Sequence, residues 1–337
     1  RGLGDVYKRQ QKKKRTAFAQ SDTGKQIMTA MIDAVRRKEA SGMVERFSHH
    51  SFLTLRLCGN ICCGCVIRDE YSQETVELPG DAVIVATGGM HGLFGNTTGS
   101  LSNTGEVTAE LFRLGVPLAN GEMIQYHPTT VKCGGKRMLI SEAARGEGGR
   151  LFAMKDGKQW YFMEEKYPEL GNLMPRDITA REIWKVSHES EVFLDMTEIS
   201  EEIISNKLSG LADDCMTYLH KDIRKEPVSV LPGIHYFMGG ILVDEQHRTP
   251  IQNLYAAGEC CAQYHGANRL GGNSLLGALY GGRVAAKSAC EQADVVDLSC
   301  ATQIDFPPTS QISEIKQLNK VMQETMGCLL YTSPSPR

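Results

Sequence analysis

The chain has 337 residues, with 37 Lys and Arg against 40 Asp and Glu, so its formal net charge is −3. Hydrophobic residues make up 41% and charged residues 23%, the balance of a globular protein long enough for two domains. A dedicated nucleic-acid-binding protein would need a basic face, and a membrane span would need about 18–20 consecutive apolar residues. The sequence therefore predicts no nucleic acid as a partner and no direct membrane span.

The first and last ten residues of the sequence can be traced to the same stretch of DNA. The first ten residues, RGLGDVYKRQ, and the last ten, CLLYTSPSPR, can be encoded by opposite strands of one DNA string. That string is similar to a transposon-type sequencing adapter. We therefore interpret residues 1–10 and 328–337 as adapter-derived scars and leave them out of the fold prediction. The natural part is expected at about residues 11–327, truncated at both ends.

The first third of the chain reads as one helix followed by short strands. Apolar residues at helical spacing, with basic residues at the C-terminal end, predict a helix over Ser21–Ala40. Runs of strand-forming residues bounded by Gly, Asn, Asp and Ser predict a meander of four strands: Val44–Phe47, Phe52–Leu57, Ile61–Ile67 and Thr75–Leu78. The apolar run Asp81–Gly89, which ends in paired glycines, predicts a strand buried on both faces, as in a parallel sheet.

The middle of the chain has a different composition. After a helix predicted at Asn103–Leu114, residues 121–233 are richer in charge. Helices are expected there at Arg176–His188, Glu198–Ser205 and Leu211–Lys221. Apolar strands return at Met238–Val243 and Leu254–Ala257, and a helix follows from Ser274 to Gln292 with Ser274 as its N-cap. The order predicts an α/β fold in which a β-rich unit is interrupted by an α-richer insertion and then resumed.

Histidine, arginine and glutamate occur among glycines in a few short segments. These segments are Gln125–Thr130, Ser141–Gly149, Pro175–Asp177, Gly233–Gly240, Ala257–Glu259 and His265–Leu275. Arginine forks and histidine donors suit the two ends of a dicarboxylate, and glycines let a flat cofactor approach the backbone.

Most of these residues also have a purely structural interpretation. His127, which precedes a proline, could cap a loop, and Glu142 with Arg145 could be an ordinary surface pair three residues apart. Arg176 could open a solvated helix. Arg269 is harder to explain in this way, because glycine-rich, apolar surroundings rarely hold an arginine without a partner. The joint order of the segments therefore carries the functional interpretation.

In that order the segments resemble the flavoprotein subunit family of fumarate reductase, succinate dehydrogenase and L-aspartate oxidase, over about Arg15–Ala286. The resemblance implies a Rossmann-like FAD-binding domain, with its N-terminal part missing, that is interrupted by a capping domain, and an active site between them. The implied boundaries are 11–121 and 236–296 for the FAD-binding domain, 122–235 for the capping domain and 297–327 for the start of a C-terminal region.

The resemblance also implies the residues of the cofactor site. FAD would lie along Gly88, Gly89, Glu259, Asn273, Ser274 and Leu275. The helix that starts there would direct its N-terminus at the flavin, where its partial positive charge stabilises an anion.

By the same resemblance, the substrate is a small dicarboxylate that is oxidised or reduced by hydride transfer at flavin N5. His127 with Ser141 would bind one carboxylate, and His235 with Arg269 the other. Arg176 would deliver the proton to the substrate carbon. Glu142 and Arg145 would restore that proton to Arg176.

The substrate, and even the presence of catalysis, stays open at this point. Gly271-Gly272-Asn273 is similar to fumarate reductase and succinate dehydrogenase, whereas Ser141-Glu-Ala-Ala-Arg145 is nearer L-aspartate oxidase. We therefore expect interconversion of fumarate and succinate, with L-aspartate oxidase as the alternative and a non-catalytic flavin-binding protein as a third hypothesis.

The resemblance also bears on partners and location, whereas the cysteine spacing bears on metals and disulfides. The family implies an iron–sulfur or other electron-transfer subunit and a cytoplasmic location with membrane association through partner subunits. No metal site is expected, because Cys58, Cys62, Cys63 and Cys65 lack a zinc-ligand spacing. The irregular cysteine spacing favours reduced thiols.

We predict that the 337-residue chain alone binds FAD weakly. It lacks the Gly-x-Gly-x-x-Gly loop that grips the pyrophosphate, and the helix beginning near Ser274 reaches one end of the cofactor only. The flavin absorbance of the purified chain, measured against protein concentration, checks this prediction. A yellow protein with stoichiometric FAD would contradict it.

Overall fold

The computed structural model describes residues 2–3, 17–18, 23–262, 264–293, 320–321 and 323. The remainder of the two adapter-like ends and of the predicted C-terminal region 297–327 lies outside the described residues. The described chain divides into a first unit, residues 1–45 and 126–235, and a second unit, residues 46–125 and 236–337. Strands β8 (Ile124–Cys133) and β14 (Leu231–Phe237) contain the two points at which the chain passes from one unit to the other.

The first unit is built on a four-stranded antiparallel sheet of order β11-β10-β12-β13. Its strands are β10 (Arg150–Lys155), β11 (Lys158–Trp160), β12 (Val192–Asp195) and β13 (Val228–Ser229). The register pairs Leu151 with Leu194 and Phe152 with Phe193, and the two phenylalanine rings stack with centroids 5.3 Å apart. Such cross-strand pairs stabilise a sheet and fix its register, because a slip of one residue would turn the buried leucines to the other face.

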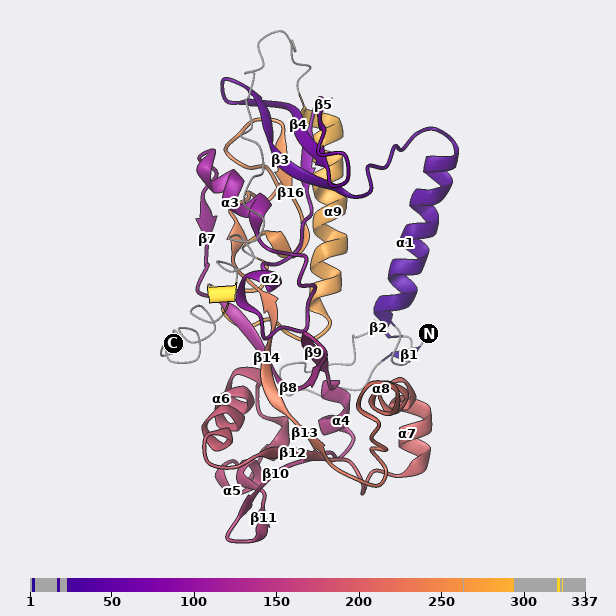
Figure 1. Cartoon of the computed structure of the whole chain (residues 1–337), viewed down its shortest axis with the longest axis vertical. Coiled ribbons are helices and arrows are strands. Elements are labelled where there is room, and N and C mark those ends of the chain that lie inside the picture. The colour runs from indigo at the N-terminus through magenta and orange to yellow at the C-terminus, as the bar shows by residue number, and fades with distance from the viewer. Residues whose placement is uncertain are drawn as a thin grey trace. The chain divides into compact units, whose positions relative to one another are not determined.

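Helices complete the first unit (Figure 1). They are α1 (Thr23–Ala40), α4 (Glu142–Gly146), α5 (Phe162–Lys166), α6 (Arg176–Ser187), α7 (Glu201–Lys207), α8 (Ser209–Leu219) and the 3₁₀ helix η1 (Gly171–Leu173). Side chains from both sheet and helices, including Ile140, Met163, Ile183, Leu194 and Met196, form one buried core. A second sheet has the order β14-β8-β9, with β9 at Lys136–Leu139, and β1 (Gly2–Leu3) pairs with β2 (Ala17–Phe18).

The second unit combines three small sheets with short helices and one long helix. Its strands are β3 (His50–Cys58), β4 (Ile61–Asp69), β5 (Thr75–Pro79), β6 (Val83–Val85), β7 (Leu118–Ala119), β15 (Gly240–Ile241) and β16 (Leu254–Ala256). Strands β3, β4 and β5 form an antiparallel meander, β7 pairs with β15, and β6 pairs with β16 in parallel. The helices are α2 (His91–Phe94), α3 (Glu106–Arg113), α9 (Asn273–Gln292) and the 3₁₀ helix η2 (Gly258–Cys260).

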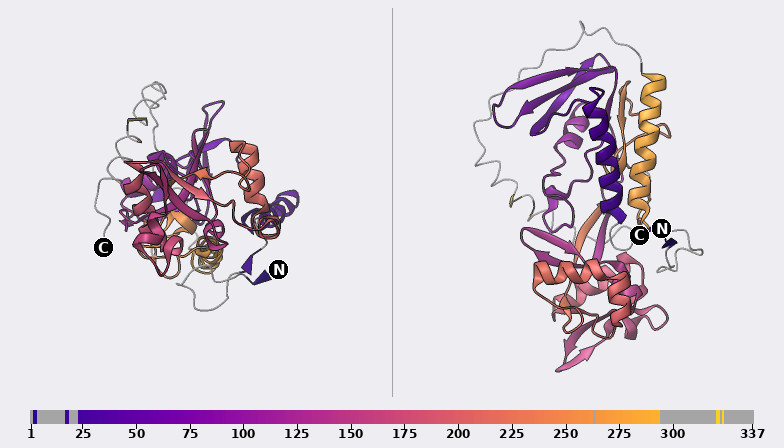
Figure 2. Two further views of the ribbon diagram at one scale, coloured as in Figure 1. Left: turned by 90° about the horizontal axis from the view of Figure 1, so that it is seen from below. Right: turned by 90° about the vertical axis from the view of Figure 1, so that its right-hand side faces the viewer.

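Helix α9 runs alongside β16 in Figure 1 and in the right-hand view of Figure 2. Its buried face consists of small residues at a spacing of about one turn: Gly277, Gly281, Ala285 and Ser288. A β-carbon at Gly281 would lie 2.0 Å from the Tyr264 hydroxyl oxygen. Small residues on this face therefore allow the long helix to pack closely on the rest of the unit.

Several sequence predictions are confirmed by these elements. The helices predicted at Ser21–Ala40, Arg176–His188 and Ser274–Gln292 are present as α1, α6 and α9. Three of the four meander strands are β3, β4 and β5. The mixed α/β fold is thus as predicted.

Other predictions are wrong in detail. Val44–Phe47 forms no strand, and Ser274 lies inside α9, because Gly272 in a left-handed conformation (φ 85°) is the N-cap. The strand β6 is not buried on both faces, since Ile84 is 40% exposed. Helix α7 starts at Glu201 because the Ser200 side chain caps it by accepting a hydrogen bond from Ile203 N. The insertion also contains a four-stranded sheet, which was not predicted because the segment is rich in charged residues.

The cysteines of the described chain are mostly free. Cys62, Cys63, Cys65, Cys133, Cys215, Cys260, Cys261 and Cys290 are free thiols, whereas Cys58 is disulfide-bonded. The expectation of reduced thiols therefore fails at Cys58. Burial raises the pKa of the Cys62 thiol to about 11, so Cys62 packs as a small apolar residue.

We predict that Leu194→Ala lowers the free energy of unfolding by about 2–5 kcal/mol, because it leaves a cavity in the first unit's core. Leu194 is fully buried on β12. Met154→Ala on the neighbouring β10, where the side chain is exposed, is the matched control and should change stability little. Urea unfolding of both variants measures the difference, and equal losses would contradict the packing described.

Candidate functional site

Two histidines face each other on the neighbouring strands β8 and β14. The rings of His127 and His235 meet edge to face with centroids 5.3 Å apart. His127 is fully buried, and its Nδ1 lies 3.3 Å from Thr129 N, from which it can accept a hydrogen bond, and 3.1 Å from the Thr129 carbonyl oxygen. Its Nε2 is buried and has no hydrogen-bond partner among the described residues. His127 therefore does not cap a loop and keeps one ring nitrogen for another group.

Helix α4 places Glu142 and Arg145 beside this pair of strands. Its N-cap is Ser141, whose hydroxyl oxygen accepts a hydrogen bond from Ala143 N at 3.2 Å. The residue before it, Ile140, is hydrogen-bonded to Thr129, so α4 starts next to the strand that carries His127. The Glu142–Arg145 pair is not a surface pair, because only 1% of the Arg145 side chain is exposed.

Arg176, the first residue of α6, joins the same cluster. Its Nη2 and Nε donate to Glu142 Oε2 at 2.9 and 3.2 Å, and Arg145 Nη2 lies 3.8 Å from Glu142 Oε1. The Arg176 side chain is 11% exposed, so it does not open a solvated helix. One carboxylate thus links two guanidinium groups in a mostly buried setting.

Asn172 supports this cluster, although its sequence context gave no signal. Its carbonyl oxygen accepts a 2.6 Å hydrogen bond from Arg145 Nη1. Its side-chain oxygen accepts from Leu151 N, and its amide nitrogen donates to Glu164. Asn172 therefore ties α4 to β10 and α5.

Burial and like charges set the proton affinities here. Burial, then the charges of Arg176, His235 and Arg145, hold the pKa of His127 well below 6.5, so its imidazole is neutral. Burial, with a smaller contribution from Arg176, lowers the pKa of Arg145 to about 10 despite the opposing effect of Glu142. Arg145 keeps its charge at neutral pH but holds its proton less tightly than a solvated arginine.

In the second unit, Gly88, Gly89 and Glu259 lie together at one edge of a parallel strand pair. Strands β6 and β16 are parallel, and the two segments follow their carboxyl ends. Glu259 Oε1 accepts hydrogen bonds from Phe237 N at 3.0 Å and from the His91 ring at 3.1 Å. Ligands of open α/β sheets bind outside the carboxyl ends of the strands, which makes this edge a candidate cofactor site.

Gly89 is required for packing within the protein. A β-carbon there would lie 2.6 Å from Glu259 Oε1 and 2.7 Å from Phe237 Cδ2. Gly88 has φ 74°, a left-handed conformation that favours glycine. Gly89 thus allows Glu259 and Phe237 to approach the loop after β6, a role that the sequence interpretation did not anticipate.

Asn273, Ser274 and Leu275 form the first turn of α9. Its N-cap, Gly272, provides no side-chain cap, and the first turn has no acidic residue. Helix α9 packs on η2, and the β-carbon of Ala278 is 3.8 Å from a β-carbon built on Gly258. This helix terminus has no side-chain cap, although Asn273 N donates to the Leu270 carbonyl oxygen at 3.2 Å, and it is suited to an anionic group.

Arg269 is buried in the second unit against Tyr236. Its guanidinium carbon lies 4.5 Å from the centre of the Tyr236 ring. The His265 ring meets Tyr236 edge to face at 5.3 Å, and Gln125 donates to the Arg269 carbonyl oxygen at 2.7 Å. Gln125, Tyr236 and His265 were within the segments singled out from the sequence but had no role assigned to them.

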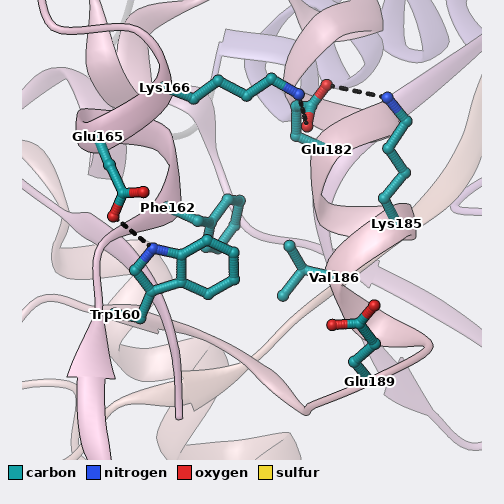
Figure 3. Close-up of a pocket in the computed structure, with 8 residues that line it drawn as sticks. All are labelled: Trp160, Phe162, Glu165, Lys166, Glu182, Lys185, Val186 and Glu189. Atoms are coloured by element: carbon teal, nitrogen blue, oxygen red, sulfur yellow. Dashed lines mark hydrogen bonds and ion pairs between the residues drawn. The ribbon is translucent and has the colours of Figure 1, made fainter. Parts of the chain in front are cut away.

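A separate pocket of ≈ 370 Å³ lies within the first unit (Figure 3). It is lined by Trp160, Phe162, Glu165, Lys166, Glu182, Lys185, Val186 and Glu189, none of which is a predicted site residue. Glu182 pairs with both Lys166 and Lys185, and Glu165 accepts the indole N–H of Trp160. Since most of its charges are already paired with one another, the pocket selects no class of ligand.

Among the residues that the structure describes, no three His, Cys, Asp or Glu side chains are grouped so as to hold a metal ion. Within the same residues, no helix has the length and apolar character needed to cross a bilayer.

The fold and these clusters were compared with known proteins. The model of the FAD binding domain family matches residues 3–275. The chain belongs to this family. It is 42% identical over 294 residues to the succinate dehydrogenase flavoprotein subunit of Bacillus subtilis, covering 85% of this chain and 50% of that protein. It is 34% identical over 272 residues to the L-aspartate oxidase of Clostridium perfringens, covering 79% of this chain and 58% of that protein.

Solved structures give the same family. An E. coli quinol fumarate reductase matches with a TM-score of 0.78 and 28% identity, over 95% of this chain and 58% of that chain. The predicted relationship to fumarate reductase, succinate dehydrogenase and L-aspartate oxidase flavoproteins is thus confirmed, and so is FAD as the cofactor. The chain is of the FAD-dependent oxidoreductase type, and it spans about half the length of the curated relatives it matches.

The residues of the second unit fit part of an FAD molecule. The first turn of α9 offers backbone N–H groups without a competing carboxylate, and Glu259 offers an acceptor at the edge of the parallel strands. Asn273, Ser274, Leu275 and Glu259 are therefore the residues that would hold the cofactor on this side.

We predict that His127 makes the first unit less stable in acid. Its native pKa lies well below 6.5, whereas in the unfolded chain it lies near 6.5. As the pH falls below about 6.5, the unfolded state takes up a proton that the folded state refuses, so stability falls by up to about 1.4 kcal/mol per pH unit. Urea unfolding between pH 7 and pH 5 should therefore show a shallower loss for His127→Gln. His188→Gln, at the exposed C-cap of α6, is the control, and equal slopes in all three proteins would contradict the prediction.

Proposed function

We propose that this chain is the catalytic portion of a flavoprotein that interconverts fumarate and succinate. The observation that carries the proposal is the buried series Arg176, Glu142 and Arg145 beside His127 and His235. It combines the positive charge of two arginines, the neutral ring of His127 and a route for a proton. The family shown above and the relatives named for succinate dehydrogenase and fumarate reductase support it.

The substrate would be recognised as a dianion. His127 and Ser141 would bind one carboxylate, and His235 with Arg269 the other. Neutral His127 has Nε2 without a protein partner, so it can donate a hydrogen bond to a carboxylate oxygen when the proton is on that nitrogen. An arginine fork adds a bidentate, charge-assisted contact of the kind that distinguishes a carboxylate from a neutral group.

FAD, when bound, supplies the two-electron oxidation and reduction. The chain's own residues would manage the proton. Arg176 would give a proton from its guanidinium to the substrate carbon in fumarate reduction, or take one in succinate oxidation. A solvated guanidinium rarely releases its proton, but here Arg145 and Arg176 lie on one carboxylate and repel each other. Burial, together with that repulsion, makes loss of a proton from Arg145 easier.

The proton lost from Arg176 would be replaced through Glu142. Glu142 Oε2 accepts from Arg176 Nη2 at 2.9 Å, and its other oxygen faces Arg145 Nη2 at 3.8 Å. Because the pKa of Arg145 is lowered to about 10, Arg145 gives a proton to this carboxylate more readily than a solvated arginine would. The bond from Arg145 to the Asn172 carbonyl oxygen keeps the guanidinium oriented during the exchange.

L-aspartate oxidase is the second candidate, supported by the relative that is 34% identical and by Ser141-Glu-Ala-Ala-Arg145. Assays of the protein expressed from a full-length gene that contains this sequence would distinguish the two functions. Fumarate-dependent oxidation of reduced viologen supports the proposal, whereas aspartate-dependent formation of hydrogen peroxide supports the oxidase. FAD binding with neither activity supports a non-catalytic flavin-binding protein.

The partner would be an iron–sulfur or other electron-transfer subunit, with membrane association through such partners. The support is that several relatives are named as flavoprotein subunits. Copurification of the tagged full-length protein, with iron and labile sulfide measured, tests this proposal.

We predict that Arg176→Lys abolishes turnover, whereas it weakens substrate binding far less. Lysine keeps the charge but is shorter and lacks the planar fork that meets Glu142 through two nitrogens. An interaction made only in the transition state lowers kcat without raising KM. Steady-state kinetics with fumarate measure both constants, at matched FAD content.

Arg269→Lys is the matched comparison. It removes a carboxylate clamp that acts in every state, so KM should rise together with any loss of kcat. If Arg176→Lys keeps a near-normal kcat and only raises KM, Arg176 is a carboxylate clamp and not the proton donor.

A further inference from the structure

Arg269 is held by the ring of a buried tyrosine. Its guanidinium carbon lies 4.5 Å from the centroid of Tyr236, and both side chains are about 5% exposed or less. A guanidinium over an aromatic face is attracted by the negative ring face, and the attraction grows where water is excluded. The plane of the Tyr236 ring therefore restricts the orientation of the guanidinium.

The backbone of Arg269 is held separately. The side-chain nitrogen of Gln125 donates to the Arg269 carbonyl oxygen at 2.7 Å and to Asn268 Oδ1 at 2.8 Å. Gln125 is itself buried, so these bonds lie away from competing water. Gln125 thus holds the backbone of Arg269, and Tyr236 holds its guanidinium group.

His265 supports the same ring. It meets Tyr236 edge to face at 5.3 Å and 71°. Burial, then the charge of Arg269, lowers the pKa of His265 to about 4, so this ring adds no positive charge beside the arginine at neutral pH. The neutral ring therefore does not repel the guanidinium, whose Nη1 donates to the Leu270 carbonyl oxygen at 3.0 Å.

We propose that Tyr236 and Gln125 are positioning residues for Arg269, setting its guanidinium for bidentate binding of a carboxylate. This proposal depends on the proposed function in one respect only, namely that Arg269 binds a carboxylate of the substrate. In the sequence, Tyr236 directly follows His235 and Gln125 lies two residues before His127. The strands that carry the two histidines thus also carry the residues that orient the arginine.

The aromatic face is tested with three substitutions in the full-length enzyme. Tyr236→Leu removes the ring and should raise KM for fumarate and Kd for malonate, a non-reacting dicarboxylate, by roughly 2- to 30-fold. Tyr236→Phe keeps the ring and should restore both constants to within about twofold, since phenylalanine also binds cations. Tyr236→Met is the substitute if the leucine variant does not fold. Calorimetry measures malonate binding without any turnover.

A double-mutant cycle separates positioning from general loss of structure. In an Arg269→Ala background, Tyr236→Leu should have no further effect on malonate affinity, because the group it positions is absent. Additive losses would overturn the proposal. Gln125→Glu, which is nearly isosteric but cannot donate two hydrogen bonds as a carboxylate, should behave in the same non-additive way.

Crystal structures of the wild type and Tyr236→Leu make the two proposals separable. A changed Arg269 rotamer in Tyr236→Leu supports positioning, even if the wild type neither binds malonate nor turns over fumarate, a result that would sink the proposed function alone. An unchanged rotamer with unchanged malonate affinity overturns the positioning role while leaving the dicarboxylate function intact.

Discussion

The charge of Arg145, buried in the first unit, is the constraint on which the rest of the candidate site depends. A buried guanidinium needs an opposite charge, and removing one partner of such a pair costs about 3–5 kcal/mol. Arg145 Nε and Nη2 are buried without a hydrogen-bond partner among the described residues, so its remaining contacts carry more weight. Here Glu142 provides the charge and the carbonyl oxygen of Asn172 provides a 2.6 Å hydrogen bond. The site therefore cannot be altered at Arg145 without disturbing the local fold.

The same constraint organises the surrounding elements. Asn172 accepts from Leu151 N and donates to Glu164, and Glu164 pairs with Arg150 through two bonds at 2.7 and 2.9 Å. These contacts join η1, β10 and α5 around the end of α4. Because Arg145 is positioned by backbone and side chains together, Glu142 is fixed between two guanidinium groups without relying on a flexible surface side chain.

The sequence allowed the mixed α/β fold and its longest helices to be predicted, but not the contacts that surround the candidate site residues. Helices α1, α6 and α9 follow from long periodic patterns, whereas β8 was missed because Pro128 interrupts it and β10 because charged ends flank its apolar centre. Asn172 could not have been found, since nothing in a lone asparagine shows which carbonyl or amide it will meet. The tight approach of Glu259 to Gly89 likewise depends on tertiary packing, which glycine pairs in the sequence do not reveal.

The arrangement of charge bears on the choice between fumarate or succinate and aspartate. Within the first unit's cluster, the carboxylate is Glu142, and it already holds Arg176 and faces Arg145. A substrate ammonium group that leaves water needs a carboxylate or several acceptors in return. A neutral His127 beside two arginines instead offers hydrogen-bond donors and positive charge, which match carboxylates at both ends of a substrate. The electrostatics of this unit thus support the proposal of fumarate and succinate as substrates, although Ser141-Glu-Ala-Ala-Arg145 is similar to the oxidase pattern. That segment keeps the two features that matter here, the cap on α4 and the Glu142–Arg145 pair, so its alanines do not alter the charge that a substrate would meet.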